Sequence, residues 1–368
     1  MKKITVAGLF SGCGGLDFGF SQAGYNIVWA NELSEDAAFS YEKLIGHKPV
    51  VRDIWDIIDE VPAVDVIVGG PPCQSFSLVG KRIQDDPRGQ LVFAYLKVIQ
   101  KVMPKIFVME NVAGLTASKI NGIRLPEHLK KQFEELGYKV TIEKLIATDY
   151  FVPQKRKRVF LIGHRNESFN VDIPKLKHFA EILNDQRFTK EISVSEALDD
   201  LPSPAPKGSK ECIQYKSSPH SPYSDLMRNK AGELVSLQSM PTMSEKDREF
   251  VKHIPPGGNY MNIPDSVSTT RILKFKQTGG RTTTYGRLHS EKPAYTINTY
   301  FNRPNVGANY HHSEQRLITV REAMRLQSFP DDFTPCYRSQ RSLHMQIGNA
   351  VPPLMARAVA EAVKGALK

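Results

Sequence analysis

The chain has 368 residues, 40% of them hydrophobic and 24% charged, and its net charge is +10. This length allows one large domain and a smaller one, and the composition is ordinary for a soluble globular protein. The apolar run after Lys2 and Lys3 is too short and too glycine-rich for a signal peptide, and no later run approaches membrane-spanning length. We therefore expect a cytoplasmic protein without a membrane partner.

The first 165 residues alternate short apolar runs, typical of strands, with helical patterns. Strands are predicted at residues 4–9, 27–30, 64–68, 106–109, 140–146 and 159–162, and helices at residues 36–44, 91–102 and 126–136. This alternation predicts an α/β fold with a doubly wound, mostly parallel sheet that is covered on both faces.

From about residue 170 the pattern degrades, because prolines and glycines interrupt a polar, basic stretch. Residues 175–310 are predicted to form a separate, loop-rich domain with short strands at 271–275 and 294–299. Helical periodicity returns at 319–327 and at 354–367, and we expect the last helix to pack on the first domain. The predicted divisions are thus 1–174, 175–310 and 311–368.

Positive charge is concentrated in the later part of the chain. Residues 1–150 hold 17 Lys and Arg against 18 Asp and Glu, whereas residues 151–368 hold 32 against 21. A basic part beside a neutral part favours nucleic-acid binding modestly, and an ordinary basic protein is the alternative.

The four cysteines are widely spaced and form no Cys-x-x-Cys pair. They are Cys13, Cys73, Cys212 and Cys336. This spacing favours neither a disulfide framework nor a zinc site, so we expect a reducing compartment and no metal.

A glycine-rich turn, FSGCGG at residues 10–15, follows the first strand. Such a turn lets a ligand approach the N–H groups of the next helix, although it lacks the GxGxxG spacing and also fits a plain tight turn. Glu32 ends the second strand where a ribose hydroxyl would be bound, and Asp53 and Ile54 follow the next segment. Placed in series after successive strands, these residues favour a nucleoside ligand over unrelated surface positions.

The strand at 64–68 leads into GGPPCQSFS at residues 69–77. Glycines and prolines there fix an irregular loop at the carboxyl end of a parallel strand, where such sheets bind ligands. A lone cysteine is more often a small buried hydrophobe. The Pro-Pro-Cys-Gln context instead predicts that Cys73 is held at the substrate crevice.

Two later strands carry further candidates. Glu110, in the tripeptide ENV, ends the strand at 106–109, although a surface glutamate is the simpler interpretation of three residues alone. In QKRKR at 154–158, an extended backbone places Arg156 and Arg158 on one side. Paired arginines suit a phosphate or a polarised carbonyl oxygen, and a solvated basic patch is the alternative.

In this order the motifs resemble those of the DNA cytosine-5 methyltransferases. RLITVREA with LQSFP at 316–330 and QIGNAVPP at 346–353 continue the resemblance, which leaves only residues from about 175 to 285 without a family pattern. It implies the Rossmann-like fold of S-adenosylmethionine-dependent methyltransferases, with 175–310 as a target-recognition domain.

The resemblance also implies residue roles. The cofactor S-adenosylmethionine would be bound by Phe10, Gly12, Gly15, Glu32, Asp53, Ile54, Pro72, Leu91 and Asn349. Cys73 would attack C6 of a flipped-out cytosine in duplex DNA, Glu110 would contact the base, and Arg156 and Arg158 would hold the base and its backbone. Leu33, where relatives can have a larger aromatic, implies weaker adenine packing.

The chemistry requires such a set. Thiolate addition at C6 makes C5 nucleophilic, and a hydrogen-bond donor at N3 relieves the charge pushed onto the ring. Because the base must leave the duplex, we interpret residues 77–90 as a closing lid, with an ordinary connection as the alternative. Contacts with DNA are expected from Gln74, Ser77, Arg88, Arg271, Lys274, Lys276, Arg281 and Arg287.

Three alternatives remain open at the level of sequence. A cytosine-5 methyltransferase acting on tRNA would share the motifs, and a catalytically silent relative would bind DNA as a regulator. A nicotinamide oxidoreductase would explain the sheet but not the Pro-Pro-Cys-Gln loop. We expect a monomeric modification enzyme, either with a companion restriction endonuclease or as an orphan.

Overall fold

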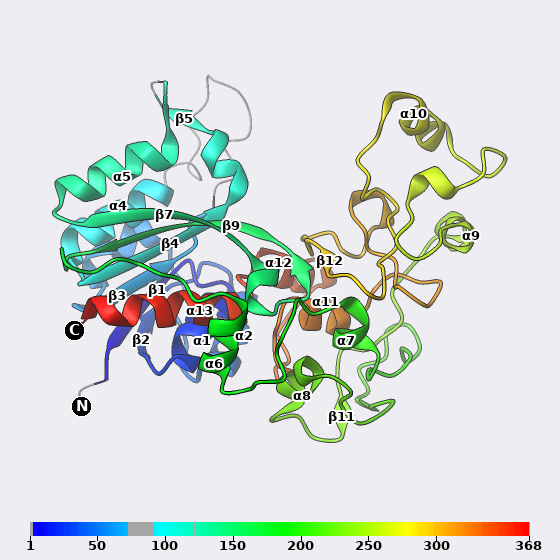
Figure 1. The fold of residues 1–368 in the computed structure, drawn as a ribbon, viewed down its shortest axis with the longest axis horizontal. Coiled ribbons are helices and arrows are strands. Elements are labelled where there is room, and N and C mark those ends of the chain that lie inside the picture. The colour runs from blue at the N-terminus through cyan, green and yellow to red at the C-terminus, as the bar shows by residue number, and fades with distance from the viewer. Residues whose placement is uncertain (1–2, 73–90, 121, 368) are drawn as a thin grey trace. The chain divides into compact units, whose positions relative to one another are not determined.

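The computed structural model describes residues 3–72, 91–120 and 122–367 (Figure 1). The chain divides into two compact units. Unit 1 consists of Met1–Ile146, Lys157–Lys175 and Val351–Lys368, and unit 2 consists of Ala147–Arg156 and Leu176–Ala350. Neither unit is one continuous stretch of sequence.

Unit 1 is built on a six-stranded sheet in the order β2-β1-β3-β4-β9-β7. Its strands are β1 (Thr5–Leu9), β2 (Asn26–Ala30), β3 (Val66–Gly69), β4 (Ile106–Val112), β7 (Lys139–Ile146) and β9 (Lys157–His164). The pairs β1–β2, β1–β3 and β3–β4 are parallel, and β9 runs antiparallel to both β4 and β7. The prediction of a doubly wound, mostly parallel sheet is confirmed.

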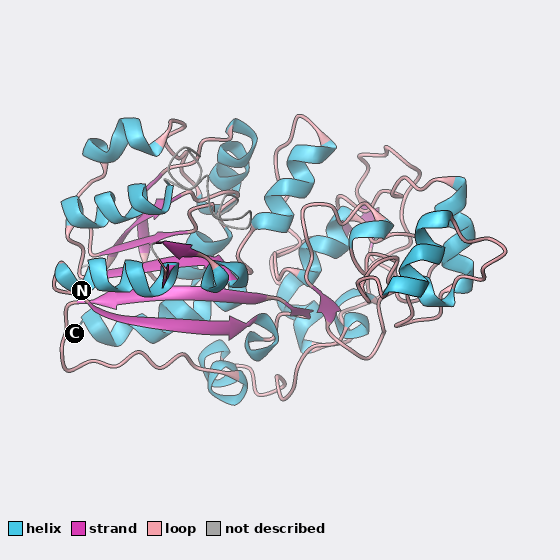
Figure 2. Ribbon diagram, turned by 90° about the horizontal axis from the view of Figure 1, so that it is seen from above, coloured by secondary structure: helices cyan, strands magenta, loops and turns pink. Residues whose placement is uncertain are grey.

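Helices cover both faces of this sheet (Figures 1 and 2). They are α1 (Gly15–Gln22), α2 (Glu35–Ile45), α3 (Ile54–Ile57), α4 (Leu91–Val102), α5 (Leu125–Glu135) and α13 (Pro353–Val363), with 3₁₀ turns η1 (Ile58–Glu60), η2 (Ala113–Ala117) and η6 (Lys364–Leu367). A two-stranded ribbon, β5 (Lys119–Ile120) and β6 (Ile123–Arg124), precedes α5. All four residues of β3 are buried, as expected for a central strand covered on both sides.

Successive side chains of β1 point to opposite faces of the sheet, so they show which helices cover each face. Ala7 and Leu9 belong to an apolar core shared with α3, α4 and α5, whereas Gly8 points toward Asp17 of α1. On that second face α13 packs on α1, because a Cβ at Gly19 would lie only 2.4 Å from the Cβ of Ala356. Only glycine allows the two helices to approach so closely.

Unit 2 has short elements joined by long connections. Its helices are α6 (Leu176–Leu183), α7 (Val194–Leu198), α8 (Pro222–Arg228), α9 (Glu245–His253), α10 (Thr270–Thr278), α11 (Val320–Leu326) and α12 (Gln340–Asn349), with η3 (Ala147–Tyr150), η4 (Tyr260–Asn262) and η5 (Pro304–Val306). Its two-residue strands are β8 (Gln154–Lys155), β10 (Ile213–Gln214), β11 (Leu234–Val235) and β12 (Ala294–Tyr295).

The strand predicted at 271–275 is wrong, because these residues lie inside helix α10. Thr269 caps the helix by accepting a hydrogen bond from the Ile272 N–H, and Gly279 ends it in a left-handed conformation with φ 76°. The strand predicted at 294–299 shrinks to the two residues of β12. The helix at 319–327 is confirmed by α11, and the one at 354–367 by α13 and η6.

A buried ionic network ties α11 into unit 2. Arg325 lies between two carboxylates, with Nη1 2.9 Å from Oδ1 of Asp200 and Nη2 2.5 Å from Oδ2 of Asp331, and all three side chains are inaccessible to solvent. Asp331 also accepts a hydrogen bond from the Tyr215 hydroxyl.

Within the described ranges, every helix is too short or too polar to cross a membrane.

Candidate active site

The glycine-rich turn connects β1 to α1 at the carboxyl end of the parallel strands. Phe10 and Gly12 both have positive φ angles, 54° and 57°, which is an uncommon conformation for a phenylalanine. The Gly12 N–H donates to Oε2 of Glu32 at 2.8 Å, and the Ser34 N–H donates to Oε1 at 2.8 Å. Two backbone donors therefore fix both oxygens of this carboxylate beside the turn.

The electrostatics of Glu32 reflect this position. Burial raises the pKa of Glu32, and the hydrogen bonds from the N–H groups of Ser34 and Gly12 oppose that shift. Its neighbour Leu33 is 67% exposed, so an apolar side chain stands in solvent next to the carboxylate. The arrangement suits a ligand that has both hydroxyl groups and a flat apolar part.

Other predicted cofactor residues of unit 1 follow β2 and β3 or begin the next helix. Asp53 is exposed and caps α3 by accepting from the Trp55 N–H, whereas Ile54 is buried. Pro72 is exposed three residues after β3, and Leu91 is half-buried as the first residue of α4. Asn349 belongs to unit 2, where it is exposed at the end of α12.

Sequence reasoning missed Asp17, a buried residue beside the glycine-rich turn. Asp17 is 1% exposed, and its Oδ1 accepts hydrogen bonds from the Tyr41 hydroxyl at 3.2 Å and the Ser11 hydroxyl at 3.4 Å. Burial raises the pKa of Asp17 to about 7. A Cβ on Gly8 would lie 1.9 Å from Oδ1, so the glycine makes room for the carboxyl group. A lone acid within the apolar segment GLDFGF was the signal for this site.

Cys73 lies outside the described residues, as do Gln74, Ser77, Arg88 and the loop 77–90 that we interpreted as a lid. The backbone leading to Cys73 is held by β4, because Asn111 Nδ2 donates to the Pro71 carbonyl at 2.9 Å. This asparagine is a second residue that sequence reasoning did not single out.

Glu110 and Arg158 form a buried ion pair beside that backbone. They lie on the antiparallel neighbours β4 and β9, and Arg158 Nε is 2.7 Å from Glu110 Oε1. The two side chains are only 9% and 10% exposed. A Cβ on Gly70 would lie 3.0 Å from Oε2 of Glu110, so the segment that leads to Cys73 passes directly over this carboxylate.

The charge of Arg158 is maintained by its partner. Burial lowers the pKa of Arg158, and the charge of Glu110 and its hydrogen bond to the guanidinium oppose that shift. Arg158 Nη1 also donates to the Lys157 carbonyl at 2.8 Å. A carboxylate and a cation are thus held together, nearly free of water, where the cysteine loop begins.

Arg156 binds backbone carbonyls in this structure. The expected alternation is present, since Lys155 and Lys157 are exposed while Arg156 and Arg158 are buried. Arg156 belongs to unit 2, however, where its guanidinium donates three hydrogen bonds of 2.9 Å. They go to the carbonyls of Ile297, Gly348 and Ala350. These bonds show that the side chain holds the backbone of unit 2, and its predicted contact with the base stays a prediction.

Arg287, for which we predicted a DNA contact, is buried in this structure. It is 8% exposed and donates to the carbonyls of Ile254 at 2.9 Å and His311 at 3.0 Å. By contrast, Arg271, Lys274 and Arg281 are exposed on unit 2. Lys276 is half-buried and paired with Asp265 at 2.6 Å.

The remaining cysteines differ in accessibility. Cys13 is 2% exposed, and burial raises the pKa of its thiol to about 12, which makes it a poor nucleophile. Cys212 is exposed and Cys336 is intermediate. In the part of the chain that the structure describes, no group of three or more His, Cys, Asp and Glu side chains could hold a metal ion.

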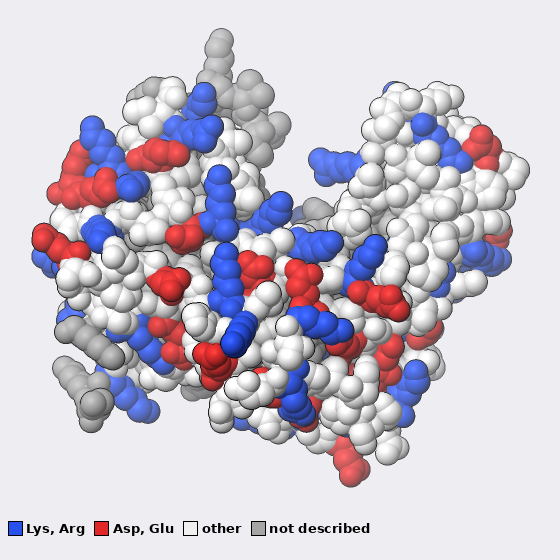
Figure 3. Space-filling model, in the orientation of Figure 1, with Lys and Arg blue, Asp and Glu red and all other residues white. Residues whose placement is uncertain are grey.

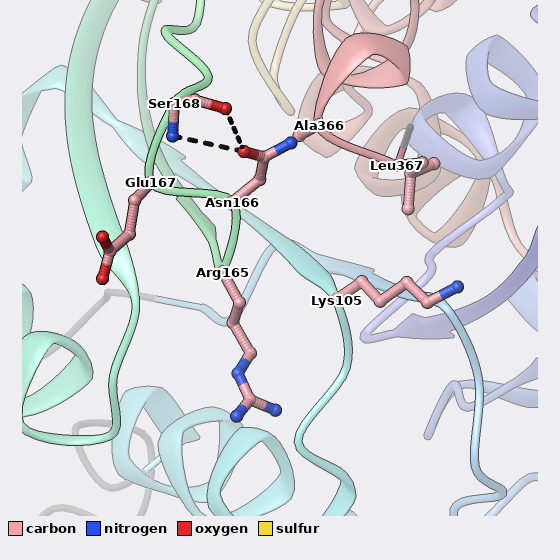
Figure 4. A pocket seen from close by; sticks show the side chains of 7 residues that line it. All are labelled: Lys105, Arg165, Asn166, Glu167, Ser168, Ala366 and Leu367. Carbon is pink, nitrogen blue, oxygen red and sulfur yellow. Dashed lines mark hydrogen bonds between the residues drawn. The ribbon is translucent and has the colours of Figure 1, made fainter.

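Unit 1 also has an open cavity of about 550 Å³ at the opposite edge of the sheet, where β4 begins and β9 ends (Figure 4). It is lined by Lys105, Arg165, Asn166, Glu167, Ser168, Ala366 and Leu367. The Lys105 and Arg165 side chains extend in different directions from it, and Asn166 is bonded to Ser168 (Figure 4). These residues do not converge on a ligand position.

Comparison with known proteins agrees with this geometry. Residues 4–365 match the family model described as C-5 cytosine-specific DNA methylase. The chain is 32% identical to Type II methyltransferase M1.HphI of Haemophilus parahaemolyticus, covering 98% of this chain and 87% of that protein. It is 34% identical to Type II methyltransferase M.NgoFVII of Neisseria gonorrhoeae, covering 96% and 84%.

Solved structures show the same fold. A prophage-encoded protein from E. coli, described as a DNA modification methyltransferase, is 25% identical, with a TM-score of 0.74 over 99% of both chains. The Entamoeba histolytica methyltransferase EhMeth is 16% identical and superimposes with a TM-score of 0.59 over 100% of both chains. The second likeness is one of fold alone.

Proposed function

The chain belongs to the C-5 cytosine-specific DNA methylase family, and we propose that it methylates C5 of one cytosine within a specific sequence of duplex DNA, using S-adenosylmethionine as methyl donor and Cys73 as nucleophile. The observation that carries this proposal is the buried Glu110–Arg158 pair beneath the backbone that leads to Cys73. The similarity to Type II methyltransferases supports a modification enzyme of a restriction-modification system.

The residues at the ends of β1 and β2 fit the cofactor. Each oxygen of Glu32 accepts one backbone N–H, which leaves further lone pairs for the two ribose hydroxyls. The exposed side chain of Leu33 and the turn at Phe10 offer apolar surface to an adenine ring. Asp53, Ile54, Pro72, Leu91 and Asn349 complete the proposed set. When bound, the sulfonium of the cofactor supplies an electrophilic methyl group.

Cys73 is proposed to add as a thiolate to C6 of the extruded cytosine. The new S–C6 bond pushes an electron pair toward C5 and N3, so that C5 attacks the methyl group. Loss of the C5 proton to a base then returns the electron pair to the ring and expels the thiolate. The sequence and structure assign no residue to that base, and water can take the proton.

Glu110 is proposed to contact N3 of the cytosine, and Arg158 its O2. In the protein without substrate, the ion pair favours the ionised carboxylate, whereas relief of charge at N3 requires a proton donor. Entry of the base must therefore loosen the 2.7 Å contact between the two side chains. Arg158 would then turn toward O2, and Glu110 would gain the proton that it shares with N3.

The substrate is proposed to be duplex DNA, gripped by unit 2, as expected for a target-recognition domain. The exposed Arg271, Lys274 and Arg281 support this assignment, since cations bind the phosphate backbone. A family member that methylates tRNA is the second candidate. We further propose a cytoplasmic monomer whose companion is a restriction endonuclease acting on the same site.

The test is methyl transfer from labelled S-adenosylmethionine to duplex DNA and, in parallel, to tRNA. Label in DNA alone is expected. Label in neither would refute the enzyme, and label only in tRNA would refute the DNA substrate.

Cys73→Ser should abolish turnover while leaving S-adenosylmethionine binding intact, because it removes the nucleophile and nothing else. Cys212→Ser is the matched control, since this exposed cysteine is expected to be dispensable. Substantial turnover by Cys73→Ser would contradict covalent catalysis.

A further inference from the structure

Helix α10 carries an exposed, positively charged face on unit 2. Residues 266–290 include Arg271, Lys274, Lys276, Arg281 and Arg287 but no Asp or Glu. Lys276 is paired with Asp265 and Arg287 is bonded to backbone carbonyls, while the Arg271 guanidinium lies 5.2 Å from the centre of the Phe275 ring. Arg271, Lys274 and Arg281 are exposed, with no carboxylate in the segment to neutralise them.

The helix has two distinct sides. Ile272 is fully buried in an apolar cluster with Ile263 and Tyr260, and Phe275 packs against that cluster. The exposed residues occupy the opposite arc of the helix, as the spacing of 3.6 residues per turn requires. They are Thr270, Arg271, Lys274, Gln277 and Thr278. Lys274 lies near the middle of this arc, about 20° from the direction opposite Ile272, and Gln277 lies at one edge of it, about 40° from that direction.

The exposed face is rigidly held. Thr269 and Gly279 cap the two ends of α10. Lys276 anchors the inner side through Asp265 and the Ile263 carbonyl, and the Tyr260 hydroxyl accepts the Gly280 N–H at 2.9 Å. A face that presents polar side chains from a fixed helix is suited to reading another surface.

Helix α9 in the same unit provides a contrast. Its Glu249 pairs with Lys252 at 2.7 Å and with His253 at 3.1 Å, so α9 neutralises its own charge. Figure 3 shows a mostly uncharged surface over the part of unit 2 that carries α9 and α10 in Figure 1, with scattered Lys and Arg side chains and fewer Asp and Glu. The excess positive charge of this part therefore belongs to α10 and the residues that follow it.

We infer that α10 enters the major groove of the DNA and that Lys274 and Gln277 contact base edges there. The inference rests on the proposed function. An α-helix about 10–12 Å across fits a major groove about 12 Å wide. Lysine suits the O6 and N7 acceptors of guanine, and glutamine suits the N6 and N7 of adenine. Arg271 and Arg281 flank the helix face and contact phosphates.

The test is a map of methylated positions. Plasmid DNA is methylated by the wild type, by Lys274→Ala and by Gln277→Ala, and 5-methylcytosine is located by sequencing. Each variant is expected to relax the consensus at one position, losing about tenfold or more in discrimination between bases there. Gln277→Glu should move the preference at its position toward cytosine, whose N4 amino group donates to a carboxylate.

Lys246→Ala, on the exposed side of α9, is the matched control and should leave the consensus unchanged. Circular dichroism and S-adenosylmethionine binding confirm that each variant is folded. An unchanged consensus in all three α10 variants, with or without a slower rate, would overturn the inference, because phosphate contacts carry no sequence information. Failure of the wild type to methylate any DNA would instead refute the proposed function.

Discussion

In the second half of β4, a carboxylate forms an ion pair with a guanidinium of the neighbouring strand, and both side chains are nearly inaccessible to solvent. The contact joins residues 48 positions apart, Glu110 and Arg158, through the antiparallel pairing of β4 and β9. Sequence could nominate both side chains, because each ends or begins a strand beside a motif. The sequence could not show that the two side chains form an ion pair without substrate. Their contact depends on the register between β4 and β9, and β9 runs antiparallel to its neighbours.

Glu110→Gln keeps the size of the side chain but cannot donate a proton to N3. We expect kcat to fall by about a hundredfold or more, with S-adenosylmethionine affinity unchanged. Single-turnover methyl transfer and calorimetric cofactor binding measure the two quantities. Glu135→Gln, an exposed position on α5, is the control. Equal losses in turnover and cofactor affinity would mean that Glu110 supports the fold instead of the reaction.

Asp17 gives a prediction about pH. Its pKa is raised to about 7 in the folded chain by burial, from an ordinary value of 3.8. Between these values the folded state binds more protons than the unfolded state, so this residue makes the protein less stable as pH rises from about 4 to 7. A shift of about three pKa units corresponds to roughly 4 kcal/mol.

Asp17→Asn removes this titration while keeping a hydrogen-bonding side chain. The free energy of unfolding of the variant, relative to wild type, should therefore rise between pH 4 and pH 7. Urea unfolding at pH 4.5, 6 and 7.5 measures the difference, and the exposed Asp172→Asn serves for comparison. A difference that does not change with pH would contradict the buried carboxyl group as its source.

At the scale of elements, Arg325 of α11 is held by Asp200 and Asp331 without access to water. Among the described residues, replacing the cation with methionine leaves buried Asp200 with only Arg228, at 3.3 Å, and buried Asp331 with only the more distant Arg321, at 3.7 Å. We expect Arg325→Met to lower the free energy of unfolding of unit 2 by about 3–5 kcal/mol. Urea unfolding followed by circular dichroism tests this, and Arg341→Met on the exposed side of α12 is the control. A loss no larger than in the control would show that the carboxylates are relieved by water or protonation.

The predicted elements agree with the structure where a segment is buried on both sides and its sequence is therefore continuously apolar. Strand β3 is buried at every residue and reads as an unbroken apolar run. Helix α10 was missed although Arg271 and Lys274, like Ile272 and Phe275, are three residues apart, which is helical spacing. Its capping residues Thr269 and Gly279 lie outside the five residues assigned to a strand. Arg156 could not be assigned, because the carbonyls that it binds lie 141, 192 and 194 residues further along the chain.

At the scale of the whole molecule, the ordered motifs identified the family, whereas the division into two units did not follow from them. The chain passes between the units after residues 146, 156, 175 and 350. QKRKR, one continuous motif in the sequence, is divided by one of these passages, so Arg156 and Arg158 belong to different units. A motif can therefore be continuous in sequence while its residues belong to different compact units.

The close packing of α13 on α1 has a consequence for synthesis on the ribosome. Gly19 contacts Ala356, and the Tyr25 hydroxyl donates to the Ala360 carbonyl, so the start of unit 1 is completed by residues made after position 350. A nascent chain that already contains all six sheet strands still exposes this side of α1. We therefore expect unit 1 to resist proteolysis only in nascent chains that already include α13, which limited proteolysis of stalled chains of increasing length would test.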